Sequence, residues 1–199
     1  FFLHLLKRPK THFMDQDKFI FCLEAVPDIE NETTTEVLKN LEQLALVTGI
    51  DSIYKTCDTI EGLEESLGTL LYDDHNFKNY EIIYLVMTGE ENNICLNNYY
   101  YSLEEIAELF EGKMKGKIIH FANAKPLDLT NDEAQYFLDV TGARAISGYG
   151  EVSYKLTSIQ LDKVFFSLCQ EEDDLVEIVE ALHEKHYTVC KMLDFRMYY

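Results

Sequence analysis

The sequence predicts an α/β fold: a three-layer sandwich in which a mostly parallel sheet of about six strands lies between helices on both faces. Short continuous apolar runs, typical of strands buried on both faces, alternate along the chain with segments whose apolar residues recur at helical spacing. Serine or threonine followed three residues later by glutamate, the spacing of a capping box, precedes three of these helical segments. The 199 residues, 47% of them hydrophobic, suffice for the core of one such domain.

The first part of the chain predicts two strand–helix units. The apolar run KFIFCL at 18–23 predicts the first strand. Thr33 and Glu36 have capping-box spacing and predict a helix. This helix ends near Gly49, because glycine readily adopts the left-handed conformation that follows many helices. A strand at 52–56 and a helix at 60–71 are predicted next.

The clearest strand is the run EIIYLVMT at 81–88, which ends at Gly89. Residues 94–96 after it predict one arm of a small hairpin. The remaining predicted elements are a helix capped by Ser102 and Glu105, a strand at 117–121, a helix capped by Thr130 and Glu133 that ends at Gly142, a strand at 143–147, helices at 157–169 and 173–186, and an edge strand at 188–198. Strands that alternate with helices in this way indicate a parallel sheet.

Charge narrows the classes of partner. The chain has 17 Lys and Arg against 36 Asp and Glu, a formal net charge of −19. Such a surface repels phosphate backbones and anionic lipids, so nucleic acid is excluded as an expected partner. Two interpretations remain open: the charge keeps the protein soluble, or an acidic face binds a basic protein or peptide.

The cysteines and histidines predict neither a disulfide framework nor a metal site. Five cysteines are scattered without a CxxC pair, which favours a reducing, cytoplasmic location. His183 and His186 lie three residues apart on an acidic helix without a third ligand nearby, so a solvated face is expected there and no metal or other cofactor.

Residues 1–13 differ in character from the rest of the chain. They contain three basic residues and no acidic one, and their apolar stretch is too short to cross a bilayer, so no stable membrane insertion is expected. We therefore predict an N-terminal extension at 1–13 and a single α/β domain at 14–199.

Several segments together resemble a known group of proteins. These are the first strand with Ile20–Glu24, the tyrosine-containing strand ending at Gly89, the segment HFANA at 120–124, and the turns TGA at 141–143 and SGY at 147–149. Their order and spacing resemble the clan CD cysteine peptidases, which include caspases and bacterial CHAT-type domains. The chain is similar, from about residue 19 to 199, to a family of small bacterial caspase-like proteins of unknown function. In that family the corresponding strand runs into His-Gly, and a His-Phe-Gly-Ser-Cys segment follows.

The chain departs from this pattern where the resemblance places catalysis. Thr88 stands where the family has its histidine, and Ala124 where the family has its cysteine. A cysteine peptidase needs a thiolate and a nearby imidazole, which alanine and threonine do not supply. Two losses with altered neighbours, Ala122 and Asn123, indicate natural loss of the dyad rather than one engineered Cys→Ala change.

The resemblance therefore implies a catalytically inactive caspase-like domain, a pseudo-peptidase that acts by binding a protein partner or by homodimerisation. The alternative is a cysteine-peptidase-like hydrolase with a rearranged active site that uses Thr88, His120 or Cys95. A third interpretation is that the likeness concerns the fold alone.

Ligands of parallel sheets bind beyond the carboxyl ends of the strands, which directs attention to loops 88–93, 122–128 and 147–153. The residues expected to line a pocket there are Gly89, Glu90, Glu91, His120, Asn123, Gly148 and Tyr149. The pair Glu90–Glu91 stands at its expected mouth, either as a site for basic side chains or as a solvated loop. His120 is expected to be a core histidine bonded to a backbone carbonyl rather than a catalytic group. Tyr99–Tyr101 is expected to form a sticky rim or to seal the start of the next helix.

Overall fold

A six-stranded sheet forms the centre of the molecule in the computed structural model, which describes residues 18–27, 35–122, 127–151 and 158–199. Its strand order is β2-β1-β3-β7-β8-β9. The strands are β1 (Lys18–Ala25), β2 (Asp51–Cys57), β3 (Ile82–Val86), β7 (Ile118–Ala122), β8 (Ala145–Tyr149) and β9 (Phe195–Tyr198). All neighbouring pairs are parallel except β8 and β9. The predicted mostly parallel sheet of about six strands is confirmed.

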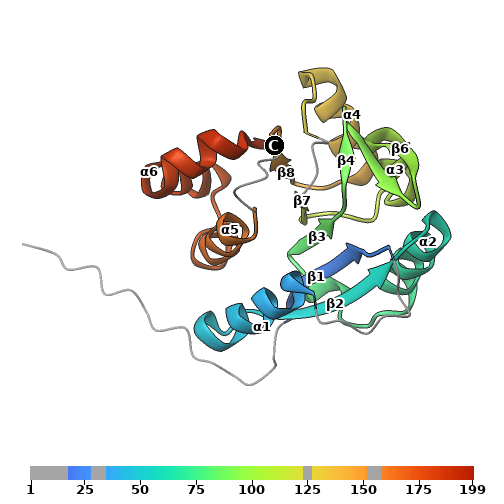
Figure 1. Cartoon of the computed structure of the whole chain (residues 1–199), viewed down its shortest axis with the longest axis horizontal. Coiled ribbons are helices and arrows are strands. Elements are labelled where there is room, and N and C mark those ends of the chain that lie inside the picture. The colour runs from blue at the N-terminus through green and yellow to red at the C-terminus, as the bar shows by residue number, and fades with distance from the viewer. Residues whose placement is uncertain (1–17, 28–34, 123–126, 152–157) are drawn as a thin grey trace, which may run out of the picture.

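Helices cover both faces of this sheet (Figure 1). They are α1 (Glu36–Thr48), α2 (Ile60–Gly68), α3 (Leu103–Leu109), α4 (Asn131–Thr141), α5 (Ile159–Glu171) and α6 (Leu175–Leu193). Because side chains alternate along a strand, β3 sends Tyr84 into the core under α1, α5 and α6, and Leu85 into the core under α2, α3 and α4. The fold is therefore a three-layer sandwich with two separate apolar cores.

The helix starts follow from their caps, with one correction. The predicted capping boxes of Ser102 with Glu105 and of Thr130 with Glu133 are both present. At α1 the capping residue is Thr35, whose hydroxyl accepts a hydrogen bond from Leu38 N, and not Thr33, which lies outside the described residues. Thr35 also contacts Glu24 and Tyr54 through its hydroxyl, which links the helix start to β1 and β2.

The run of tyrosines forms a strand, which was not predicted. A small antiparallel sheet contains β4 (Gly89–Glu90), β5 (Asn93–Leu96) and β6 (Tyr99–Ser102), in that order. Two-residue turns join its strands, and all four turn residues have positive φ: Glu91, Asn92, Asn97 and Asn98. Such turns favour asparagine, which tolerates the left-handed conformation, and they match the twist of a hairpin. The predicted hairpin arm at 94–96 is thus confirmed, with Tyr99–Tyr101 as its partner strand.

The C-terminal prediction was wrong over most of its length. Residues 188–193 continue α6, and the edge strand is limited to the four residues of β9. The helix has a non-helical backbone at His186, where φ is −132°, so two helical stretches meet at this kink. The predicted helix end at 186 corresponds to this kink. The edge position of the last strand is confirmed.

Candidate binding site at the carboxyl edge of the sheet

Thr88, at the position where the resemblance places a catalytic histidine, lies two residues after the end of β3 and is exposed. Its carbonyl oxygen accepts a hydrogen bond from Cys95 N at 2.7 Å, so the hairpin returns directly over the strand end. Gly89 permits this return, because a Cβ at this position would lie 2.0 Å from the carbonyl oxygen of Asn93. Gly89 therefore serves the close crossing of two backbones.

The two acidic residues expected at the mouth of the pocket lie on the hairpin. Glu90 accepts a hydrogen bond from the hydroxyl of Tyr100 at 3.2 Å, and Glu91 is an exposed turn residue with φ of 52°. Neither lines the cavity described below. Asn123 and Ala124 lie outside the described residues.

His120 belongs to the core, as expected, but its partners differ from the expectation. The side chain is 0% exposed and points toward α5. Its Nε2 lies 3.0 Å from Asp162 Oδ1 and its Nδ1 lies 2.8 Å from Ser147 Oγ. Because carboxylate oxygens accept hydrogen bonds, Nε2 donates to Asp162, and Nδ1 shares a hydrogen bond with the Ser147 hydroxyl. Both partners are side chains rather than a backbone carbonyl.

Asp162 is the centre of this buried group. Its carboxylate also accepts hydrogen bonds from the hydroxyls of Tyr84, at 2.7 Å, and Tyr149, and from Ser158 at 3.2 Å. Burial, followed by the charge of Asp162, raises the pKa of Tyr84 and of Tyr149 well above the usual range. Four donors thus stabilise a carboxylate that is 1% exposed.

Gly148 and Tyr149 are core residues in this arrangement and do not line the cavity described below. A Cβ at Gly148 would lie 2.4 Å from Leu127 Cδ1 and 2.8 Å from the carbonyl oxygen of Phe121. Tyr149 is 1% exposed and its hydroxyl is bonded to Asp162. The residues grouped by sequence as one pocket therefore separate into an exposed hairpin and a buried cluster.

The structure places a cavity of about 310 Å³ on the other side of the hairpin turn, where the first turns of α3 and α4 meet. Its lining residues are Asn92, Ser102, Leu103, Glu104, Leu129, Asp132, Glu133, Tyr136 and Phe137. More of the lining is apolar than polar, and its polar part includes three carboxylates. The arrangement suits a group that is apolar along its length and positively charged or hydrogen-bonding at its end.

Asn92 fixes one wall of this cavity. Its side-chain Nδ2 donates to the carbonyl oxygen of Asp128 at 3.1 Å, and its Oδ1 accepts from Asp128 N at 2.7 Å. Its carbonyl oxygen accepts from Leu103 N, the first residue of α3. The turn is therefore bonded both to the start of α3 and to the segment that leads into α4.

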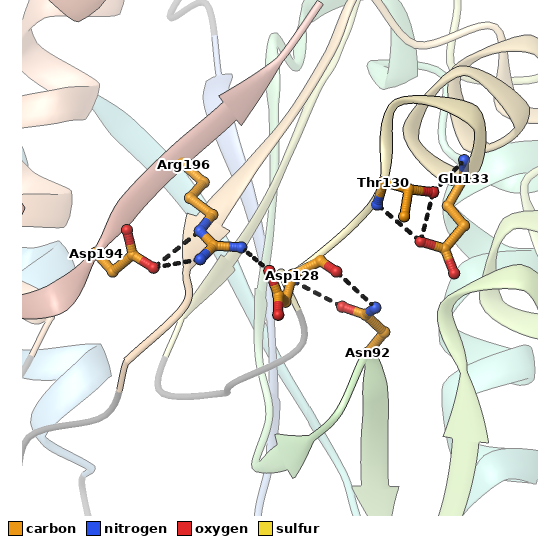
Figure 2. A network of polar contacts seen from close by, with 6 residues as sticks. All are labelled: Asn92, Asp128, Thr130, Glu133, Asp194 and Arg196. Atoms are coloured by element: carbon orange, nitrogen blue, oxygen red, sulfur yellow. Dashed lines mark hydrogen bonds and ion pairs between the residues drawn. The ribbon is translucent and has the colours of Figure 1, made fainter.

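Arg196 of β9 reaches the same segment from the opposite side. Figure 2 shows its guanidinium between Asp194 and Asp128, with Asn92 on the far side of Asp128. Hydrogen bonds from Arg196 to Asp194, and then to Asp128, raise the pKa of the arginine further above its usual range. The carboxylate of Asp128 is thus already paired within the chain.

Glu133, at the start of α4, is held by its capping box (Figure 2). Its Oε2 accepts from Thr130 N at 2.7 Å and from the Thr130 hydroxyl at 2.8 Å. These hydrogen bonds, the backbone one first, lower the pKa of the Glu133 carboxyl. Glu133 therefore keeps its negative charge at the cavity.

Four of the five cysteines belong to the cores. Cys22, Cys57, Cys169 and Cys190 are buried, and burial raises the pKa of each thiol, to about 12 for Cys57 and Cys169. Cys95, on the hairpin, is half-buried. Across the parts of the chain that the structure describes, no group of three or more His, Cys, Asp or Glu side chains could hold a metal ion.

Sequence comparison places the chain in a protein family. Residues 17–199 match the family described as "Family of unknown function (DUF6642)". The chain belongs to this family. The comparison with curated proteins gives no match. The matched segment begins one residue before β1 and includes β9, so it covers all six strands of the central sheet and the residues that line the cavity in this chain.

No helix within residues 18–27, 35–122, 127–151 and 158–199 is long and apolar enough to cross a membrane.

Sequence reasoning missed two groups of functional residues for which the sequence contained a signal. Asp162 falls in register with the apolar residues Phe165, Phe166 and Cys169 of α5, and an acidic residue in such a stripe indicates a buried partner. The two capping boxes marked the helix starts that border the cavity.

Proposed function

We propose that this chain is a catalytically inactive, caspase-like domain that acts by binding a protein partner. The position of His120 carries the proposal. It is the histidine nearest in sequence to the expected nucleophile position, yet it is 0% exposed and both ring nitrogens are bonded inside the core, to Asp162 and Ser147. A base in that position cannot reach a substrate bound at the carboxyl edge of the sheet.

The Ser147–His120–Asp162 chain of hydrogen bonds does not restore an enzyme. Ser147 and His120 are both 0% exposed, and His120 is surrounded by the rings of Tyr84, Tyr149, Phe165 and Phe166. A nucleophile must approach within bonding distance of the substrate, so the core would have to open first. These hydrogen bonds between Ser147, His120 and Asp162 instead hold α5 against the sheet.

Two features support a role in binding. The cavity beside the hairpin turn provides an apolar surface with carboxylates at its border, and the net charge of −19 favours partners with basic segments. A homodimer is the second form that such binding can take. The exposed tyrosines Tyr99 and Tyr100 of the edge strand β6 offer a surface for that contact.

The proposal is tested by pairing a cleavage assay with a binding assay on the same preparation. A fluorogenic peptide library should show no turnover above a protein-free blank, and a peptide array should show captured sequences. Light scattering reports whether the chain dimerises. Turnover that iodoacetamide abolishes, and that is lost in Cys95→Ser, would replace this proposal with the rearranged hydrolase. The proposal would also be contradicted if the protein showed no turnover, captured no peptide and formed no dimer.

A further inference from the structure

The cavity between the starts of α3 and α4 combines apolar walls with acidic side chains. Leu103, Leu129 and Phe137 supply its apolar walls, and Tyr136, with 41% of its surface exposed, adds an aromatic face. Glu104 and Asp132 are exposed acidic residues in the lining. A long side chain with an apolar stem and a cationic head has the matching chemistry.

The carboxylates of the cavity are available to an outside group. The side chains of Glu104 and Asp132 have no hydrogen-bond or ion-pair partner among the described residues, whereas Glu133 uses one carboxylate oxygen to cap α4. The nearby cation of the chain itself, Arg196, is paired with Asp128 and Asp194. Within the described residues, no cation of the chain therefore neutralises the negative charge of the cavity.

The same charges argue against an anionic ligand. Helix starts often bind phosphate because their backbone N–H groups point outward. Here Glu105 and Glu133 already accept hydrogen bonds at the starts of α3 and α4. A phosphate in the cavity would also face Glu104 and Asp132, which would repel it.

We infer that this cavity receives an arginine side chain from a segment of the partner polypeptide. Arginine fits better than lysine, because its planar guanidinium can stack on Tyr136 and pair with two carboxylates at once. A volume of about 310 Å³ lies at the small end of ligand sites, which suits one side chain rather than a larger molecule. This inference rests on the proposed function and identifies what its binding surface recognises.

The test titrates ¹⁵N-labelled protein with N-acetyl-arginine amide and, separately, with the citrulline analogue, which has nearly the same shape and no charge. Arginine should shift backbone amide signals at 102–104 and 129–137, and citrulline should shift them weakly or not at all. Shifts spread over many acidic surfaces, equal shifts with both compounds, or no shifts would overturn the inference.

Matched variants separate the cavity from general attraction to an acidic protein. Glu104→Gln with Asp132→Asn should weaken arginine binding about fivefold or more, in line with the loss of two exposed ion pairs. The control, Glu180→Gln with Glu184→Gln, makes the same change in net charge on exposed positions of α6 and should leave binding nearly unchanged. Equal weakening in both variants would contradict the inference.

The outcomes also separate this inference from the proposed function. Peptides that are captured on the array equally by the wild type and by the Glu104→Gln, Asp132→Asn variant would refute the cavity as the site and leave a binding role intact. Thiol-dependent cleavage of the library would refute the proposed function whatever the titration shows.

Discussion

Asn92 is a single residue on which three segments depend. It occupies the second position of the turn between β4 and β5 with φ of 61°. Its side chain makes two hydrogen bonds to the backbone of Asp128, and its carbonyl accepts from the first residue of α3. Asparagine serves both needs, because it tolerates the left-handed conformation and its amide both donates and accepts.

We expect Asn92→Gly to lower the free energy of unfolding by about 1 kcal/mol, because the two hydrogen bonds to Asp128 are lost while the backbone keeps its conformation. Asn92→Ala should cost about 2 kcal/mol, since alanine adds the strain of a positive φ. Urea denaturation measures both changes.

Asn98 provides the matched control for these variants. It has φ of 65° in the second turn of the hairpin, and its side chain has no hydrogen-bond partner among the described residues. Asn98→Gly should therefore leave the stability nearly unchanged. A similar loss in Asn92→Gly and Asn98→Gly would mean that the amide bonds to Asp128 contribute nothing.

At the scale of elements, Asp162 connects one helix to three strands. It lies on α5 and accepts hydrogen bonds from Tyr84 on β3, His120 on β7 and Tyr149 on β8. The apolar face of α5 packs on the same strands. Apolar packing alone would tolerate small shifts of the helix, whereas these directed bonds define how it lies on the sheet.

We expect Asp162→Ala to lower the free energy of unfolding by about 3–5 kcal/mol, because it leaves the buried groups of Tyr84, His120 and Tyr149 without their shared acceptor. Gln160→Ala, at an exposed position of the same helix, controls for the change in helix propensity and should stay within about 0.5 kcal/mol. Thermal and urea denaturation give the comparison. A loss in Asp162→Ala below about 1 kcal/mol would show that the cluster does not stabilise the fold.

At the scale of the whole molecule, the fold was more predictable than the site. Apolar runs such as 81–88 and the capping boxes at Ser102 and Thr130 are local patterns, and the structure keeps them. The end of the chain shows the limit: residues 188–193 have enough apolar and β-branched character for a strand, but they continue α6, which buries Cys190 and Leu193 in the core that also contains the apolar residues of α5.

The site could not be predicted in the same way, because it depends on contacts between residues that are far apart in the sequence. Gly89 lies in β4, which follows β3, and Gly148 and Tyr149 are the last two residues of β8. Whether a side chain there faces solvent or a core was decided by the hairpin crossing at Gly89 and by the buried acceptor Asp162, 42 residues from His120. The cavity arises from two helix starts that are adjacent only after folding.

Buried ionisable groups in both cores predict how the stability of the whole molecule depends on pH. Burial raises the pKa of Cys57 and Cys169 from 9.0 to about 12, and raises those of Tyr84 and Tyr149 above 10. These groups lose their protons first in the unfolded chain. Their contribution to the free energy of unfolding is fully present below the pKa that each group has in the unfolded chain. It is lost as the pH rises toward the pKa of the group in the folded protein.

Lys117 acts in the opposite direction. Its Nζ is buried against the carbonyl oxygens of Phe77 and Tyr80, and burial lowers its pKa from 10.5 to about 8. Between these values the unfolded chain holds the extra proton, so this group adds stability as pH rises, by at most about 1.4 kcal/mol per pH unit. The stabilising effect of Lys117 therefore begins at about pH 8, below the pH at which most thiols of the unfolded chain ionise.

We therefore expect the free energy of unfolding to rise slightly from pH 8 to about pH 9 and then to fall steeply toward pH 11. At the higher pH the destabilising effect of the buried cysteines and tyrosines exceeds the stabilising effect of Lys117. Urea denaturation at each pH measures the profile. Lys117→Met should remove the rise and keep the fall, because methionine retains much of the apolar stem without the titrating amine. A profile that stays flat from pH 9 to 11, or a rise that persists in Lys117→Met, would show that these buried groups do not control the alkaline stability of the fold.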